Sequence, residues 1–238
     1  MKRWISQGAC NLCGETISKT NMTRHITTCR KSHALNKWNG RGKLRKADLF
    51  HLVVEGTDRP EYWLHLEVPT DATLQDLDQF LRDIWLECCG HLSAFTIEKT
   101  QYELDTGGVD AMWPMLFGRG SPPKSMRIPL GSVLRPSRKF HHEYDFGTTT
   151  TLTLKVVSEY QGQAKGNSVQ VLARNVAPPI VCEQCAKPAT LVCTQCIYDG
   201  EGWVCDECAP DHKCGEEMML PVVNSPRMGV CGYTGGRY

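Results

Sequence analysis

The sequence of 238 residues contains no stretch of about 18 consecutive apolar residues, and this absence excludes a membrane-spanning helix. The basic start at Lys2 and Arg3 is not followed by the apolar segment that a secretory signal needs. We therefore expect a cytoplasmic protein without a membrane partner. Apolar residues make up 41% of the chain and charged residues 22%, a balance that excludes a disordered tail and a coiled coil and indicates a folded, water-soluble protein.

Motifs of common enzyme classes are also scarce. No glycine loop of the G-x-x-x-x-G-K type occurs, so a phosphate-cradling loop of that kind is excluded. The acidic residues between 71 and 83 lie in or beside an amphipathic segment, and the histidines at 91, 141 and 142 follow no catalytic spacing. The serines and arginines between 119 and 138 form a basic loop without the signs of an activated nucleophile. We assign no catalytic residue and keep a nuclease or recombinase accessory as an alternative, to be tested at Asp145 and His91.

Charge is distributed unevenly along the chain. The formal net charge is only +1, but residues 1–46 hold eleven Lys and Arg against the single acid Glu15. Residues 47–238 hold sixteen Lys and Arg against twenty-five Asp and Glu. A basic arm thus precedes an acidic body. Such an arm is typical of proteins that bind DNA or RNA, although it could also dock on an acidic protein surface.

Cysteine, in contrast, is abundant, with thirteen in the chain. Cys10 and Cys13 form a C-x-x-C pair, and His25 and Cys29 follow after eleven residues. The C-x-x-C turn supplies two thiolates, and a His and a Cys four residues apart supply two more donors from one helix face. Together they make the tetrahedral set that zinc prefers. We predict a CCHC zinc finger with a basic arm over residues 1–46.

The finger and its arm offer candidate nucleic-acid contacts. In the usual ββα form of such a finger, the exposed reading positions would be Ser18, Asn21 and Arg24. Arginine can pair with guanine and asparagine with adenine, but one finger reads only about three base pairs. Further phosphate contacts are expected from the basic stretch, at Arg30, Lys31, Arg41, Lys43, Arg45 and Lys46. A purely structural or protein-docking finger is the alternative.

The C-terminal region has a second set of metal-binding spacings. Its four ligand pairs are Cys182 and Cys185, Cys193 and Cys196, Cys205 and Cys208, and His212 and Cys214. Eight ligands make two closed sites of four, which are structural because no position remains for water or substrate. The short and similar gaps favour a cross-brace like that of B-box and RING-type modules, in which alternate pairs share an ion; sequential pairing is the alternative. We predict a di-zinc module over residues 179–238, and three zinc ions in all.

Three cysteines stay outside these sets. Cys88 and Cys89 are adjacent and lack ligand spacing, so we expect buried cysteines at the end of a helix. Cys231 could replace His212 or Cys214 as a ligand, or be a buried thiol.

Between the cysteine-rich ends, residues 47–178 have the pattern of an α+β domain. Strands are predicted over 48–55 and 61–68, from 95 to about 104, and over 149–157 and 168–173. In the second of these, Leu64 and Leu66 lie on one face and Trp63 and His65 on the other.

A helix should lie between the second and third of these strands. Asp71 or Thr73 can cap it, and its apolar stripe continues to about Glu87. Residues 105–143 are rich in glycine and proline and are expected to form a long excursion with one short helix.

Short motifs of the central domain occur in the order of a known family. They are Tyr62-Trp63-Leu64 leading to Glu67-Val68-Pro69, Thr73-Leu74-Gln75-Asp76-Leu77, His91-Leu92-Ser93-Ala94-Phe95 and Tyr144-Asp145-Phe146-Gly147. They resemble the bacterial family named after the third open reading frame of a root-inducing plasmid, whose members are often labelled insertion-element passenger proteins or TnpR. The tail from Leu220 to Tyr233 is similar to that of its zinc-bearing members. The chain departs from the family at Thr148, Thr149 and Thr150, where members often have an acid and an aromatic residue.

The resemblance implies an α+β domain with a mixed or antiparallel sheet, here flanked by two small zinc-stabilised modules, in a bacterial protein associated with a mobile element. It implies little chemistry, because a fold does not determine an activity. The expected function is therefore non-catalytic, zinc-stabilised binding of DNA or RNA through the finger and arm. The alternative is a protein-interaction adaptor that binds a partner through residues 182–214.

Overall fold

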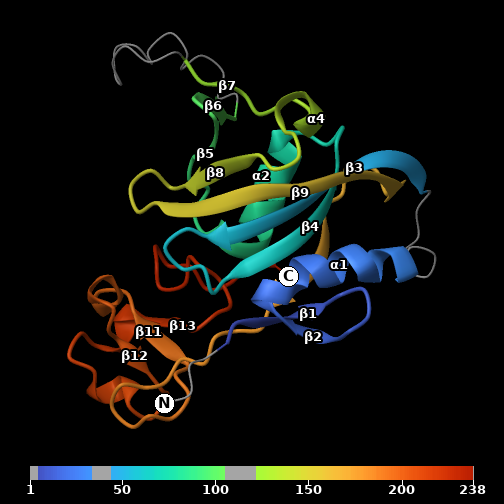
Figure 1. Ribbon diagram of the computed structural model, residues 1–238. Coiled ribbons are helices and arrows are strands. Elements are labelled where there is room, and N and C mark those ends of the chain that lie inside the picture. Colours follow the sequence, from blue (N-terminus) through green and yellow to red (C-terminus); the bar gives the residue numbers. More distant parts are fainter. Residues whose placement is uncertain (1–4, 34–43, 105–121, 238) are drawn as a thin grey trace. The chain divides into compact units, whose positions relative to one another are not determined.

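A computed structural model describes residues 5–33, 44–104 and 122–237 of the protein. The chain forms two compact units (Figure 1). The first, called here the sheet unit, is built from the described residues of segments 1–80 and 92–175. The second, called the cysteine-rich unit, is built from those of segments 81–91 and 176–238. No helix in the described part of the chain is long and apolar enough to span a membrane.

The sheet unit contains a ten-stranded sheet (Figure 1). Strands β6 and β7 pair in parallel, and the other neighbouring strands pair antiparallel. This mixed sheet confirms the predicted α+β class. The strand order is β2 (Thr16–Ser18), β1 (Gln7–Cys10), β10 (Gln170–Asn175), β4 (Trp63–Pro69), β3 (Arg45–Gly56), β9 (Thr150–Ala164), β8 (Lys139–Tyr144), β5 (Ser93–Ile97), β6 (Thr100–Glu103) and β7 (Lys124–Ser125).

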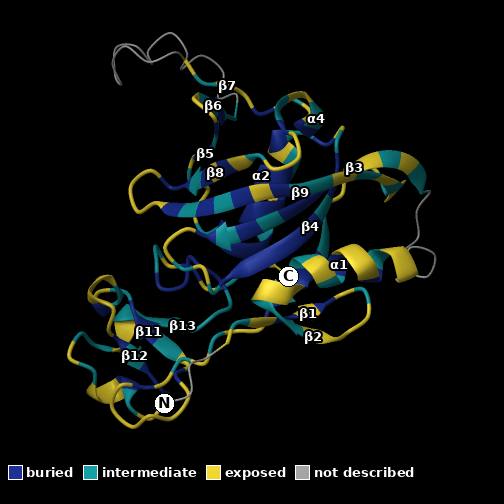
Figure 2. Ribbon diagram, viewed as in Figure 1, coloured by how far each residue is buried: buried dark blue, intermediate teal, exposed yellow. Residues whose placement is uncertain are grey.

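Strand β4 is buried on both of its faces (Figure 2). Leu64 and Leu66 are fully buried on one face, and on the other Trp63 is fully buried and His65 is 2% exposed. An alternating strand normally leaves one face to water, so a second layer must cover the Trp63 face. That layer is the N-terminal finger.

The finger is continuous with the sheet. Its hairpin strand β1 pairs with β10 from Gly8↔Asn175 to Cys10↔Ala173, and helix α1 (Lys19–His33) follows the hairpin. Gly8 allows this close approach, because a Cβ there would lie 2.3 Å from the Trp63 ring. Trp63 shares one hydrophobic cluster with Cys10, Met22, Ile26, Cys29, Leu172 and Ala173. The finger and the sheet therefore have a common core.

Helix α2 (Leu74–Leu81) begins where the sequence indicated. The Thr73 backbone N–H donates to the Asp76 carboxylate (2.8 Å), and the Asp76 N–H donates to the Thr73 hydroxyl (3.1 Å), a reciprocal cap that satisfies two donors of the first turn. The helix continues as a π-helical turn, η1 (Arg82–Leu86), and ends at Glu87, whose backbone is extended. The predicted end at about Glu87 is thus correct within one residue.

A buried carboxylate ties α2 to two strands. Asp78 accepts hydrogen bonds from the Ser93 hydroxyl of β5 and from His142 Nε2 of β8, both at 2.7 Å. All three side chains are at most 3% exposed. A buried charge needs such partners, and here they hold the helix on the sheet.

The stretch predicted as an excursion is more ordered than its composition indicated. It contains the short helix α4 (Leu130–Val133), as expected, but also strands β7 and β8, which were not predicted. In β8, Phe140, His142 and Tyr144 point into the core, so an alternating pattern was present within the polar segment. Residues 105–121 lie outside the described part.

The cysteine-rich unit has little regular structure. A three-stranded sheet has the order β12 (Trp203–Val204), β11 (Leu191–Cys193) and β13 (Met219–Pro221). Three 3-10 turns complete it: η3 (Cys196–Asp199), η4 (Ala209–Asp211) and η5 (Glu216–Met218). One of its clusters of buried residues contains only Cys182, Val204, Cys205 and Ala209. The unit also buries Trp85, Met228 and Tyr233, so its hydrophobic core is larger than this cluster alone. The predicted boundaries at residues 46–47 and 178–179 stay a prediction.

Candidate metal centres

The finger brings its four predicted ligands together. Cys10 ends β1, Cys13 lies in the following turn, and His25 and Cys29 lie one turn apart on α1. Their donor atoms all lie within 4.8 Å of one another. The Cys10 and Cys29 sulfurs are 3.9 Å apart, and Cys13 Sγ is 3.4 Å from His25 Nε2. Zn–S bonds of about 2.3 Å at tetrahedral angles separate ligand atoms by roughly 3.5–3.8 Å, so this set fits zinc.

Electrostatics in the finger favour a cation. Desolvation by burial, together with the neighbouring Cys13 and Cys10, raises the pKa of the Cys29 thiol to about 12. All thirteen cysteines are free thiols, so no disulfide accounts for their proximity. A divalent cation among these thiols would reverse the effect, because it stabilises the thiolates. Metal binding would thus offset the crowding of the four donors.

The cysteine-rich unit forms two further four-ligand sets. Cys182 and Cys185 lie with Cys205 and Cys208, and Cys193 and Cys196 lie with His212 and Cys214. This is the interleaved, cross-braced order of the ligand pairs. The sulfurs of Cys185 and Cys205 are 3.5 Å apart, and Cys196 Sγ is 3.5 Å from His212 Nε2 and 3.7 Å from Cys214 Sγ. These separations again match the edges of a zinc tetrahedron.

Backbone amides favour ionisation of Cys182, the first ligand of this unit. Desolvation opposes ionisation of Cys182, but hydrogen bonding from the backbone of Cys185, Cys205 and Gln184 lowers the pKa of this thiol to about 6. Donors aimed at sulfur stabilise a thiolate, and a thiolate is the form that binds metal. With four protein donors each, the three sets are closed sites suited to a structural ion.

A fourth set was missed by the sequence reasoning. Cys88, Cys89, His91 and Cys231 also place their donor atoms within 4.8 Å of one another. They include the three cysteines outside the predicted zinc sites. The expected burial of Cys88 and Cys89 is wrong, because Cys88 is partly exposed and Cys89 is exposed. Cys231 is partly exposed and lies with these residues, not with His212 and Cys214. Spacing could not reveal the set, because two of the ligands are adjacent and Cys231 lies 140 residues after His91. The only signal was the surplus of three cysteines itself. Within the described part of the chain, four Cys/His clusters could hold metal ions.

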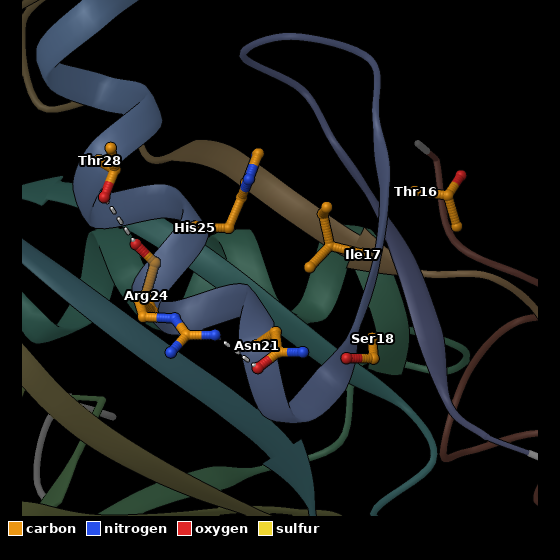
Figure 3. Close-up of a pocket in the computed structure, with 7 residues that line it drawn as sticks. All are labelled: Thr16, Ile17, Ser18, Asn21, Arg24, His25 and Thr28. Carbon is orange, nitrogen blue, oxygen red and sulfur yellow. Dashed lines mark hydrogen bonds between the residues drawn. The ribbon is translucent and has the colours of Figure 1, made fainter.

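The predicted reading positions lie together where β2 leads into α1: Ser18 ends the strand, and Asn21 and Arg24 lie on the helix (Figure 3). Ser18, Asn21 and Arg24 line a surface hollow of about 460 Å³, with the ligand His25 at its edge. Arg24 Nη2 donates to Asn21 Oδ1 at 3.1 Å. The opposite face of α1 carries the buried Met22 and Ile26, so the helix period separates a packed face from a solvent face.

The predicted basic contacts have different surroundings. Lys31 and Lys46 are exposed, whereas Arg30 stacks on the Tyr160 ring with its Cζ 3.3 Å from the ring centroid. Arg45 forms an ion pair with Asp71 at 2.6 Å. Arg41 and Lys43 lie outside the described residues.

Asp145, one of the two residues named for the catalytic alternative, forms hydrogen bonds within its own turn. The Asp145 carboxylate accepts from the backbone N–H groups of Gly147 and Thr148 and from the Thr148 hydroxyl. Asp145 is also 5% exposed and has a positive φ of 65°, the geometry of an Asx turn. Its described contacts are those of a turn residue.

The central region of the chain matches a known protein family. The family described as "Plasmid pRiA4b ORF-3-like protein" matches residues 50–188, more than half of the chain. The chain belongs to this family. The resemblance inferred from the motifs is thereby confirmed. The pRiA4b ORF-3-like region spans β4 to β10 and the first C-x-x-C pair of the cysteine-rich unit, while the finger and the remaining C-terminal ligands lie outside it.

A solved structure with similarity to this pRiA4b ORF-3-like chain serves as an example. It is that of a protein of unknown function, MM3350, from Methanosarcina mazei Go1. The identity is 18%, the TM-score is 0.39, and the match covers 53% of this chain and 67% of that one. No curated protein is significantly similar to the chain.

Proposed function

We propose that the protein is a zinc-stabilised, non-catalytic nucleic-acid-binding protein associated with a mobile element. The observation that carries this proposal is the hollow lined by Ser18 at the end of β2, by Asn21 and Arg24 on α1, and by the predicted ligand His25. Arginine and asparagine are the side chains that read guanine and adenine in the major groove. A zinc ion bound by His25 and Cys29 would fix the helix that presents them. Membership in a plasmid-derived family supports the mobile-element association.

Charge supports the same face. The first 46 residues carry eleven basic side chains and one acid. On α1, Lys31 is exposed two residues after the last zinc ligand, Cys29, where it can reach a phosphate. Because each phosphate contact releases counterions, binding should weaken steeply as salt increases. One finger reads only about three base pairs, so affinity with little sequence specificity is expected.

Fluorescence anisotropy with labelled duplex DNA and with RNA, measured between about 50 and 200 mM salt, tests this function. Arg24→Ala is expected to weaken binding about tenfold, the loss of roughly 1–3 kcal/mol that removal of a bidentate base contact produces. Lys155→Ala is the matched control, because Lys155 is an exposed cation on β9 of the same unit. The nucleic-acid affinity of this variant should stay within about twofold of that of the wild type, because a substitution at a remote surface position usually has little energetic effect.

Point variants are preferable to removal of residues 1–46. Trp63 packs on the finger, so truncation would expose a fully buried indole. Absence of binding, or an affinity that salt does not change, would contradict the proposal. Divalent-metal-dependent cleavage of the probe would instead support the nuclease alternative.

A protein-interaction adaptor is the second candidate function. Among its described residues, the cysteine-rich unit exposes three large apolar side chains, Tyr198 at 65%, Val181 at 55% and Val176 at 51%. Exposed aromatic residues on a rigid module are frequent anchors of protein interfaces. Tyr198→Ala should then abolish partner capture and leave nucleic-acid affinity unchanged, a combination that pull-down and anisotropy measurements on one preparation can detect.

A further inference from the structure

The fourth Cys/His set lies in the cysteine-rich unit, outside the predicted zinc sites. The inference drawn from it does not depend on the proposed nucleic-acid function. Its donors come from two chain segments, Cys88 to His91 and the tail at Cys231. His91 Nε2 lies 3.2 Å from Cys231 Sγ, and Cys89 Sγ lies 3.9 Å from the Cys231 carbonyl oxygen. We propose that Cys88, Cys89, His91 and Cys231 bind a fourth zinc ion, which joins these two segments.

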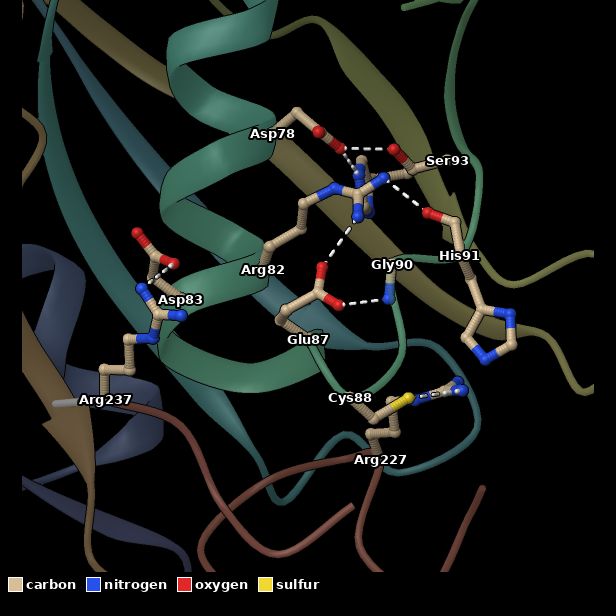
Figure 4. Close-up of polar contacts among 11 residues, drawn as sticks. Asp78, Arg82, Asp83, Glu87, Cys88, Gly90, His91, Ser93, Arg227 and Arg237 are labelled. Carbon is tan, nitrogen blue, oxygen red and sulfur yellow. Dashed lines mark hydrogen bonds and ion pairs between the residues drawn. The ribbon is translucent and has the colours of Figure 1, made fainter. Parts of the chain in front are cut away.

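The loop that carries three of the donors is held in shape by polar contacts (Figure 4). Arg82 donates from Nη1 to the Glu87 carboxylate at 2.7 Å and from Nη2 to the His91 carbonyl oxygen at 2.6 Å. Glu87 in turn accepts from the Gly90 N–H at 2.6 Å. Gly90 has a φ of +73°, a conformation that few other residues adopt, and so reverses the chain between Cys89 and His91. This geometry lets adjacent cysteines and a nearby histidine converge without a C-x-x-C turn.

The tail is fixed independently of the ligands. The Ser225 hydroxyl donates to the Trp85 carbonyl oxygen at 2.7 Å and accepts from the Arg227 N–H at 3.0 Å. Cys231 itself has a positive φ of 50°, a strained conformation for a residue with a side chain. Strain of this kind persists where the surrounding structure requires it, and here it turns Cys231 toward His91.

Charge also fits a thiolate-rich zinc site. Three thiolates, one neutral imidazole and Zn²⁺ sum to a net charge of −1, which needs a cation nearby. Arg227 is fully buried, and its Nη2 donates to Cys88 Sγ at 3.5 Å (Figure 4). Arg227 is thus suited to balance the site as an outer partner of the Cys88 ligand.

The donor set identifies the metal. Thiolate and imidazole donors select zinc over calcium or magnesium, which prefer oxygen. Four protein donors leave no open position, so the ion would be structural. No ligand of this set is fully buried, whereas each of the other three sets has at least one buried cysteine. The fourth ion should therefore be the first that a chelator removes.

Zinc content of the purified full-length protein, measured by inductively coupled plasma mass spectrometry, tests the proposal. We expect four zinc ions per chain in the wild type, three in Cys231→Ser, and four in Cys231→His, which restores a donor. Val230→Ser is the matched control, because it is adjacent, similarly exposed and not a ligand, and it should keep four. Three ions in the wild type, with no loss in Cys231→Ser, would overturn the proposal.

Alkylation of Cys88 and Cys89, followed by peptide mass spectrometry, locates the ion even if a variant folds poorly. In the wild type both thiols should be protected until a chelator is added, and in Cys231→Ser both should react at once. Immediate labelling of the wild type, or a disulfide between Cys88 and Cys89, would exclude zinc at this site. Arg227→Gln should weaken the affinity for the fourth ion by about 10- to 100-fold, the usual effect of losing an outer-shell partner. An unchanged affinity would remove Arg227 from the proposal.

Discussion

The two units of this protein solve the problem of stability in different ways. The sheet unit buries aromatic and aliphatic side chains, among them Trp63, Phe50, Phe95 and Phe140, within ten paired strands. The cysteine-rich unit has strands of two or three residues and places three of the four Cys/His sets in segments 81–91 and 176–238. Hydrophobic burial scales with the area removed from water, whereas metal binding concentrates stabilisation at a few atoms. The two units should therefore fail under different treatments.

Removal of metal should have the largest effect. Structural zinc contributes about 10–16 kcal/mol of binding free energy in small metal-held domains, so a chelator should unfold the cysteine-rich unit completely. Strands β3 and β9, paired over most of their length, should stay folded. Hydrogen exchange with mass spectrometry can follow both units in one sample, and added zinc should restore the protection of residues 182–214. Simultaneous loss of protection in β3 and β9 would refute this separation.

Truncation of the central indole should have the next largest effect. Trp63→Ala is expected to destabilise the sheet unit by about 3–5 kcal/mol, because it leaves a cavity in the core that the finger and sheet share. Denaturant unfolding measures the loss. The control is Phe146→Ala in the same unit, since Phe146 is 47% exposed and should cost less than about 1 kcal/mol. Equal losses for the two variants would mean that the shared core is not important for stability.

Acid should weaken the sheet unit through two buried histidines. Desolvation lowers the pKa of His51 to about 3 and of His65 to about 4, and the two rings share a hydrogen bond of 2.8 Å. In the unfolded chain both take up protons near pH 6.5, so the unfolded state binds more protons between about pH 6.5 and 4. Stability from this pair is complete above pH 6.5 and should fall by about 1–3 kcal/mol by pH 5.5.

Denaturant unfolding at a series of pH values, with zinc in excess, checks this slope. The histidines are surrounded by further charged groups, because Arg30 lowers the pKa of His51 and Lys19 lowers that of His65. The double variant His51→Gln, His65→Gln keeps hydrogen-bonding groups that do not titrate in this range. It should lose most of the pH dependence, and an undiminished slope would assign the effect to other groups.

Removal of a single hydrogen bond should give the smallest difference in stability loss between the two units. Thr73→Ala removes the cap of α2 and should cost about 1 kcal/mol. Thr190→Ala removes an exposed bond to Asp206 (2.8 Å) in the cysteine-rich unit and should cost less than about 0.5 kcal/mol. Thermal unfolding of the zinc-loaded variants measures both. A larger loss for Thr190→Ala would show that hydrogen bonds, and not only metal ligands, hold the cysteine-rich unit.

Local patterns were predictable from the sequence, and contacts between distant segments were not. The Cys10, Cys13, His25 and Cys29 set depends on neighbours within one hairpin and its helix, so spacing alone predicted that these residues come together. The cap of α2 depends on one turn, and the sequence left Asp71 and Thr73 as alternatives, of which the structure has Thr73. The fourth metal set needed the approach of Cys231 to His91 across 140 residues, which no spacing encodes. Strand β8 was hidden in a polar segment and became a strand by pairing with β9 and β5.

The layer that covers β4 could have been expected from one observation. Trp63 and His65 alternate along β4 with the leucines of the opposite face. They therefore lie on the face that a sheet with one solvated side would leave to water, and an indole there indicates a covering element. The sequence showed the residues but not what covers them, because the cover comes from the start of the chain. The strand of the finger that pairs with the sheet, β1, has as its partner β10, which ends at Asn175. Only the folded structure joins these two segments.

The pairing of Gly8 with Asn175 has a consequence for the order of synthesis. The strand beside which the finger must settle is synthesised roughly 165 residues after the finger itself. At roughly 5–20 residues per second, the wait is on the order of ten seconds. During that time Cys10, Cys13, His25 and Cys29 are already available to zinc, while Trp63 has nothing to cover it. The finger can thus bind zinc and fold early, but it can pair with β10 only late in synthesis. The zinc supply during translation should therefore affect how much protein reaches its final fold.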